Sequence, residues 1–314
     1  MMSAANEQND TMAETGCVMH APTVSALRSA TVIIMVALMA FVACFAGASR
    51  ARDVDATALA ERYQLMRPRI AASPFDRPLV VDSGDDGGRI HGEIHGDLDQ
   101  PFARLAAGLK SPDEWCAVIA LHVNVKGCAY EHTNEGDFLT VYSGRKVYEA
   151  IEPARAIRYA FRVRTARSDY LKVVLAAPTG PLGTHEYEVV LEAMPIGGHT
   201  FVGLSYAFRA SAASRFATVA YLATAGSGKA GFTIVGRSSD GQPKAIGGLR
   251  GIVERNAMRN FLALEAWLET RDAPIEDRLE RRLECMAELV SRYPQLVEMP
   301  AAEYVAIKRR EWQE

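Results

Sequence analysis

The residues best suited to chemistry form an alternating run, His91-x-Glu93-x-His95-x-Asp97. Side chains alternate across a β-strand, so these four would emerge on one face. Imidazole and carboxylate groups bind zinc and related metals, which makes His91, Glu93 and His95 a candidate metal site. The intervening residues of 90–98 are apolar or glycine and read as the inward face. The simpler interpretation is therefore a solvent-exposed polar face, with no metal or other cofactor predicted.

A second group of candidates lies on a long helix predicted over Leu249–Glu269. At 100° per residue, Asn256 and Asn260 lie one turn apart at the margin of an apolar face, beside Trp267. Buried amides need hydrogen-bond partners. These two either orient a ligand in a cavity or bond strand-end carbonyls and water. All three are candidate ligand-binding residues.

The predicted strand over 121–130 supplies a further candidate. His122, Asn124, Lys126 and Cys128 alternate with aliphatic residues or glycine. If the aliphatic set fills the core, Lys126 is solvent-exposed. If the faces are reversed, Lys126 is a buried cation that could anchor a ligand carboxylate.

No segment carries a catalytic signature. The glycine-containing stretches at 178–184 and 226–229 lack the ending or the following helix of a phosphate-binding loop. There is no Gly-x-Ser-x-Gly elbow. The sequence thus favours a binding protein over an enzyme, with a cyclase, a hydrolase or a metal-dependent enzyme on the same scaffold as the alternative.

The N-terminal region has the character of an export signal. Residues 31–48 are almost wholly apolar, Arg28 precedes them, and Ala46-Gly47-Ala48 offers small residues for cleavage. We expect 1–48 to be a signal peptide; an uncleaved membrane anchor formed by 31–48 is the alternative. Both place the folded part outside the cytoplasm, periplasmic or secreted, with membrane proximity possible.

Three cysteines follow this segment, namely Cys116, Cys128 and Cys285. An oxidising compartment would let Cys116 and Cys128 form a disulfide, whose short loop would add about 3 kcal/mol of stability. Two reduced, buried thiols are the alternative. The odd Cys285 is either buried or intermolecular.

Composition bounds the class of protein. The chain has 314 residues, of which 49% are hydrophobic and 23% charged, as in a globular protein with a real core. The net charge is -3 and no long basic run occurs, so nucleic acid is not expected as a partner.

The order of predicted elements resembles a known superfamily. In RIHGEIHGDLDQPFARLAAGLKSPDEW a strand enters a helix through Asp99-Gln100-Pro101, a second short helix follows, and further strands precede the long helix. Over residues 89–269 the chain is similar to the START-like (SRPBCC, helix-grip) superfamily. The resemblance implies an α+β fold in which a seven-stranded antiparallel curved sheet grips a long C-terminal helix. It also implies a cavity for an apolar or amphipathic, lipid-like molecule, with an expected volume of ~300–1,000 Å³.

The expected domains follow from this resemblance: a helix and linker over 49–76, the helix-grip domain over 77–270, and a helical extension over 271–314. The chain departs from the superfamily pattern by an insertion at about 211–247, before the long helix. In the extension, a leucine stripe runs through alternating Glu and Arg. These helices dock on their own domain or on a second copy. A non-catalytic envelope interaction protein is thus a further alternative.

Overall fold

The computed structural model describes residues 55–151, 154–216 and 229–313. The expected signal segment and part of the expected insertion at about 211–247 lie outside these ranges. No helix within them is long and apolar enough to cross a membrane.

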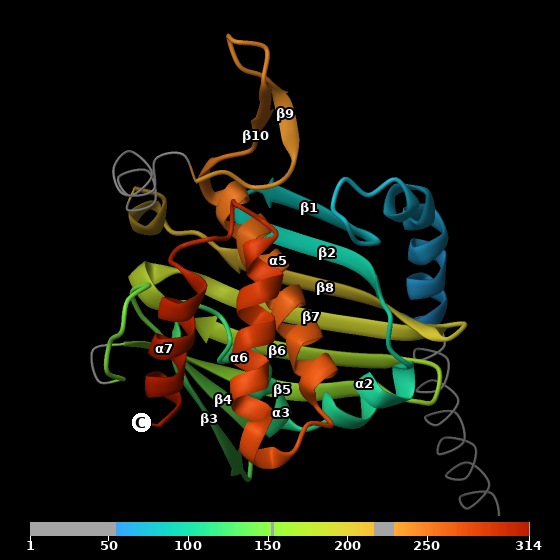
Figure 1. Ribbon diagram of the computed structural model, residues 1–314, viewed down its shortest axis with the longest axis vertical. Helices are drawn as coiled ribbons and strands as arrows, with labels where there is room; N and C mark the ends of the chain where they lie inside the picture. Colours follow the sequence, from blue (N-terminus) through green and yellow to red (C-terminus); the bar gives the residue numbers. More distant parts are fainter. Residues whose placement is uncertain (1–54, 152–153, 217–228, 314) are drawn as a thin grey trace, which may run out of the picture. The chain divides into compact units, whose positions relative to one another are not determined.

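One antiparallel sheet contains eight strands in the order β1-β2-β8-β7-β6-β5-β4-β3 (Figure 1). The strands are β1 Leu79–Asp86, β2 Arg89–Leu98, β3 Val125–Thr133, β4 Gly136–Ser143, β5 Arg155–Ala166, β6 Leu171–Thr179, β7 His185–Ile196 and β8 His199–Arg209. Consecutive strands from β3 to β8 are neighbours in the sheet, as in a meander. β2 lies next to β8 and pairs with it, and Leu98 is opposite Thr200.

The expected count of seven strands is wrong by one. The strands β2 to β8 are the seven that the helix-grip pattern requires. The eighth, β1, forms a hairpin with β2 and lies at the edge of the sheet. Gly87 and Gly88 form the turn with positive φ, a conformation that glycine adopts without steric cost.

Among the described residues, the helices are one over 55–71, α2 Phe102–Gly108, α3 Pro112–Ile119, α5 Gly248–Thr270, α6 Ile275–Ser291 and α7 Ala301–Trp312, with a 3₁₀ turn η1 at Pro181–Gly183. Residues 212–216 are also helical. α5 confirms the predicted long helix and crosses the strands on one face of the sheet (Figure 1). Gly92 of β2 permits this close packing, since a Cβ there would lie 2.7 Å from the carbonyl oxygen of Val253.

The opposite face of the sheet is covered in part by the helix over 55–71. Leu59 and Ile70 from this helix form a buried cluster with Val80, Tyr170 and Phe201 of the sheet region. The sequence predicts that the face of β2 with His91, Glu93, His95 and Asp97 is solvent-exposed. This prediction is wrong where the helix over 55–71 covers that face.

The C-terminal extension packs against the helix-grip body. Leu283 and Met286 of α6 are buried in the main core together with residues of α5. Tyr304 of α7 is buried too, and its hydroxyl donates a hydrogen bond to the carbonyl oxygen of Leu121 at 2.7 Å. The leucine stripe is thus used within the chain, and self-association through these helices stays a prediction.

The described part of the insertion contains a two-stranded hairpin, β9 Ile234–Arg237 and β10 Pro243–Ala245, that projects beyond the sheet (Figure 1).

Candidate functional site

The candidate site is a cavity of about 210 Å³ between the sheet and the helices α3 and α5. Most of its lining is apolar and comes from Leu109, Trp115, Val118, Ile119, Val125, Val141, Ile157, Leu175, Val189, Leu191, Leu204 and Leu264. Seven polar residues complete it: His122, Asn124, Ser143, Tyr159, Tyr206, Asn256 and Asn260. The volume is below the expected range, so the cavity suits a compact molecule.

The cavity lies where the α5 prediction placed it. Asn256 and Asn260 project from neighbouring turns of α5 and both line it. Whether they orient a ligand stays a prediction.

His122 and Asn124 face the two α5 amides from a turn at 120–124, between α3 and β3. The backbone N–H of Asn124 donates a hydrogen bond to Nδ1 of His122 at 3.2 Å, and the Asn256 side chain bonds to the same imidazole. With Nδ1 accepting, the proton of the neutral ring lies on Nε2. We call His122, Asn124, Asn256 and Asn260 the polar wall.

The imidazole of His122 is held in its neutral form. Burial, followed by the positive charges of Arg259, Lys146 and Lys308, lowers the pKa of His122 to about 3. The hydrogen bond with Asn256 opposes this lowering without reversing it. At neutral pH His122 therefore acts as a hydrogen-bonding group and not as a charged one.

The Asn124 side chain has an unused acceptor. Its Oδ1 atom is buried and has no hydrogen-bond partner among the described residues. A buried acceptor without a partner costs free energy, and this atom is closed off from solvent.

Two tyrosines lie across the sheet side of the cavity. Tyr159 packs edge-on against Tyr187, with ring centroids 6.3 Å apart, and Tyr206 lies 6.2 Å from the same ring. Burial raises the pKa of Tyr159 and that of Tyr206, so both phenols stay protonated and can donate hydrogen bonds.

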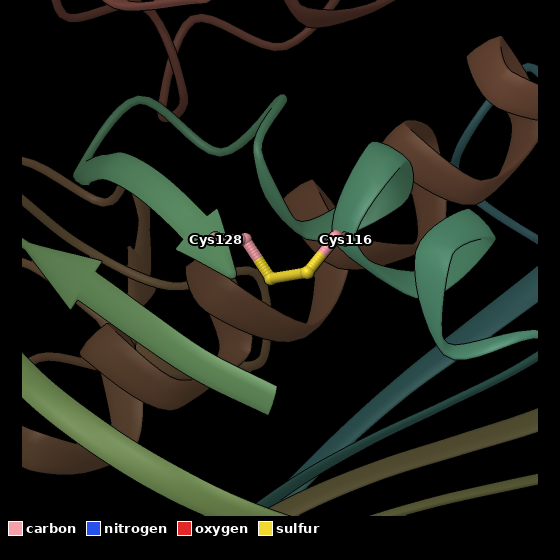
Figure 2. The surroundings of a disulfide bond; sticks show 2 residues. All are labelled: Cys116 and Cys128. Atoms are coloured by element: carbon pink, nitrogen blue, oxygen red, sulfur yellow. A yellow bond between two sulfur atoms is a disulfide. The ribbon is translucent and has the colours of Figure 1, made fainter. Parts of the chain in front are cut away.

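The disulfide lies beside the polar wall. Cys116 of α3 and Cys128 of β3 are bonded, which confirms the predicted pairing, and Figure 2 shows the bridge joining the helix to the strand. Because the 120–124 turn lies between the two cysteines, the bridge restricts the backbone that carries His122 and Asn124.

Two other predicted ligand-binding residues lie away from the cavity. The expectation of a solvent-exposed Lys126 is wrong, because its side chain is fully buried and its Nζ lies 2.7 Å from Glu311 of α7. Trp267 is buried against Gly108, and its Nε1 donates to Glu114 at 2.6 Å. Neither contributes to the cavity lining.

The weak metal alternative finds no support in the described ranges. These contain no group of three or more His, Cys, Asp or Glu residues that could hold a metal ion. His95 instead stacks on Phe201, with ring centroids 6.0 Å apart, and burial lowers its pKa to about 4. His91 is near Asp86, 3.4 Å away.

Sequence reasoning missed His122, Asn124 and the two tyrosines as cavity residues. The alternation over 121–130 suggested a strand, but β3 begins at Val125 and the preceding residues form a turn. In this turn Leu121 and Val123 face the C-terminal helices, while His122 and Asn124 face the cavity. The available signal was that two polar residues, His122 and Asn124, follow a predicted short helix.

Comparison with known proteins adds fold likeness only. No protein-family model matches the chain, and no curated protein matches it. Among solved structures, an aromatase/cyclase from Streptomyces sp. R1128 is 13% identical, with a TM-score of 0.35, covering 58% of this chain and 95% of that one. Ara h 8.0201 is 12% identical with a TM-score of 0.33, covering 58% and 99%.

A truncated norcoclaurine synthase from Thalictrum flavum is 13% identical, with a TM-score of 0.27, covering 42% of this chain and 78% of that one. At such TM-scores the likeness carries no argument about what this chain binds. The strand order β2-β8-β7-β6-β5-β4-β3 and the long helix α5 across the sheet are nevertheless those of the helix-grip fold, which this chain has.

Proposed function

We propose that this chain binds a compact apolar or amphipathic small molecule in the cavity between the sheet and α5. The observation that carries the proposal is a cavity of about 210 Å³ with apolar walls and a few converging polar groups. That combination is typical of small-molecule sites. A dry apolar cavity of about 150 Å³ binds benzene in another protein, so this one suits a ligand of one or two rings, or a short branched chain, better than a whole lipid.

We further propose that the protein works outside the cytoplasm. The Cys116–Cys128 disulfide supports this, since such bonds persist in oxidising compartments. The apolar segment at 31–48 supports it from the sequence.

Binding is favoured over catalysis by the state of the polar wall. His122 is neutral, with a pKa of about 3, so it is a poor general base near neutral pH. Its neighbours are amides, which hydrogen-bond to a ligand without reacting with it.

Native mass spectrometry of the full chain after periplasmic expression tests the proposal, together with calorimetric titration of 2-naphthamide as a neutral two-ring probe. We expect a co-purifying small molecule or 2-naphthamide to bind with one-to-one stoichiometry. Leu264→Trp should abolish binding, because Leu264 is buried on the cavity wall and indole would fill the space.

Leu182→Trp is the matched control, because Leu182 is exposed on the η1 turn. Leu204→Phe, which fills the cavity from β8, is a second variant should Leu264→Trp not unfold cooperatively. Equal binding by the wild type and by folded cavity-filled variants would exclude this cavity as the site.

A further inference from the structure

We propose that the ligand carries an anionic head, a carboxylate or a similar acid group, which is held at the polar wall while the apolar body fills the rest of the cavity. This inference rests on the proposed function and names its ligand class. Two observations support it: the neutral donors that line the cavity and the cations that stand behind them.

The lining offers neutral hydrogen-bond donors. No Asp, Glu, Lys or Arg is among the described residues that line the cavity. If Oδ1 of Asn256 accepts from Nε2–H of His122, the amide N–H₂ of Asn256 stays free to donate. Asn260, Ser143 and the tyrosine hydroxyls add donors from other sides.

Behind the polar wall lies a first group of cations. Arg259, Lys146 and Lys229 all contact the single carboxylate of Glu298, and Arg259 is 2.7 Å from it. Arg259 follows Asn256 by three residues on α5 and immediately precedes Asn260. The guanidinium and the carboxylate are both almost fully buried.

A second group of cations lies beside the same turn. Lys126 and Lys308 share the carboxylate of Glu311, each at 2.7 Å, and all three side chains are buried. Lys308 also donates to the carbonyl oxygen of Val125, a residue that lines the cavity. Nearby Glu149 pairs with its own cation, Arg145.

Among the described residues, cationic side chains outnumber carboxylates in these two groups. Five cationic side chains share the two carboxylates of Glu298 and Glu311. The three lysines among them, Lys126, Lys146 and Lys308, already outnumber those two carboxylates. In a weakly polarisable interior such an excess acts over several ångströms, and it favours an anion in the cavity over a cation.

The pKa of His122, which lines the cavity, reflects this positive potential. After burial, the charges of Arg259, Lys146 and Lys308 are the main causes that lower its pKa. The same potential that disfavours an imidazolium would stabilise a carboxylate at the same place.

Matched probes test the charge of the head. We would titrate the full chain with 2-naphthoate, 2-naphthamide and 2-naphthylmethylammonium in an isothermal calorimeter at pH 6.5. At this pH the pKa values of Lys146 and Lys308, both about 8 because burial lowers them, keep these lysines charged. We expect naphthoate to bind roughly tenfold more tightly than naphthamide, and the ammonium probe to bind least.

The variant Lys146→Met ties this preference to the cations. It removes one positive charge from the group around Glu298. The Lys146 side chain is 23% exposed and does not line the cavity. We expect naphthoate affinity to fall about fivefold and naphthamide affinity to stay unchanged. Lys172→Met is the matched control, because Lys172 is also 23% exposed but pairs with Asp55 and Glu192, acids that are not part of this group.

The outcomes separate the two proposals. If naphthamide binds as tightly as naphthoate, the cavity binds ligands but the anionic head is overturned. If Lys146→Met and Lys172→Met weaken naphthoate equally, the assignment to the cations is overturned. If no probe binds, both the inference and the proposed function fail.

Discussion

At the scale of single residues, two buried histidines, His95 and His122, are held neutral by their surroundings. Burial, helped by the charge of Arg62, lowers the pKa of His95 to about 4. His122 is lowered further, to about 3. Both start from a value of 6.5, so the unfolded chain binds more protons than the folded chain below that pH.

Acid should therefore destabilise the fold as the pH falls below 6.5. Stability from His95 is fully present above pH 6.5 and is lost as the pH falls towards 4. We expect this residue alone to reduce the free energy of unfolding by roughly 2 kcal/mol between pH 8 and pH 5. Urea unfolding at a series of pH values measures the slope.

The variant His95→Phe should flatten that slope. Nδ1 of His95 has no hydrogen-bond partner among the described residues, and the ring already stacks on Phe201, so phenylalanine suits the site. His132→Phe, at an exposed position on β3, controls for the substitution itself. An unchanged slope in His95→Phe would contradict a buried neutral His95.

What the sequence predicts at this scale depends on the regularity of the backbone. Asn256 and Asn260 could be placed because helical periodicity is reliable over the length of α5. His122 could not, because alternating residues in a turn imitate a strand. Lys126 was placed in solvent because its partner Glu311 lies 185 residues further along the chain.

At the scale of elements, the helix over 55–71 is attached by a few buried side chains. Leu59 is 1% exposed against the sheet, whereas Leu65 on the same helix is 76% exposed. We expect Leu59→Ala to lower the free energy of unfolding by about 3 kcal/mol. Leu65→Ala should change it by less than about 0.5 kcal/mol, as for a surface substitution. Equal effects in urea denaturation would mean that the helix is not docked through Leu59.

The bridge between α3 and β3 supports a second prediction at this scale. Replacing both Cys116 and Cys128 by alanine should lower the free energy of unfolding by about 3 kcal/mol, as expected for a closed loop of this length. Amide hydrogen exchange in the 120–124 turn should rise more than exchange in β6 and β7. Uniform protection in the two proteins would show that the bridge does not order the turn.

Element order and type were largely predictable from the sequence, since turn residues separate the strands and α5 is long and periodic. The docking of the helix over 55–71 on the sheet was not. Its amphipathic pattern shows that one side packs, but it does not identify the surface that receives it.

At the scale of the whole molecule, the C-terminal extension contributes buried side chains to the interior of the protein. Lys126, Lys308 and Glu311 form a buried group that joins β3 to α7. We expect Glu311→Gln to lower the free energy of unfolding by about 3 kcal/mol, because two buried ammonium groups would lose their carboxylate.

Glu303→Gln is the control for that change, because Glu303 is an exposed residue near the start of the same helix. Thermal or urea unfolding compares the two variants. A similar small effect for both would contradict a stabilising role of the Glu311 carboxylate. This junction was not predictable, because it joins segments that no local sequence pattern links.

The pairing of β2 with β8 has a consequence for how this protein is made. Arg89 is paired with Arg209, so β2 cannot take its place in the sheet until the ribosome has produced β8. Non-local pairing of this kind slows folding, because a long loop must close before its contacts form. Nascent chains should therefore keep β1 and β2 undocked until β8 has been made, a state compatible with the export that we propose.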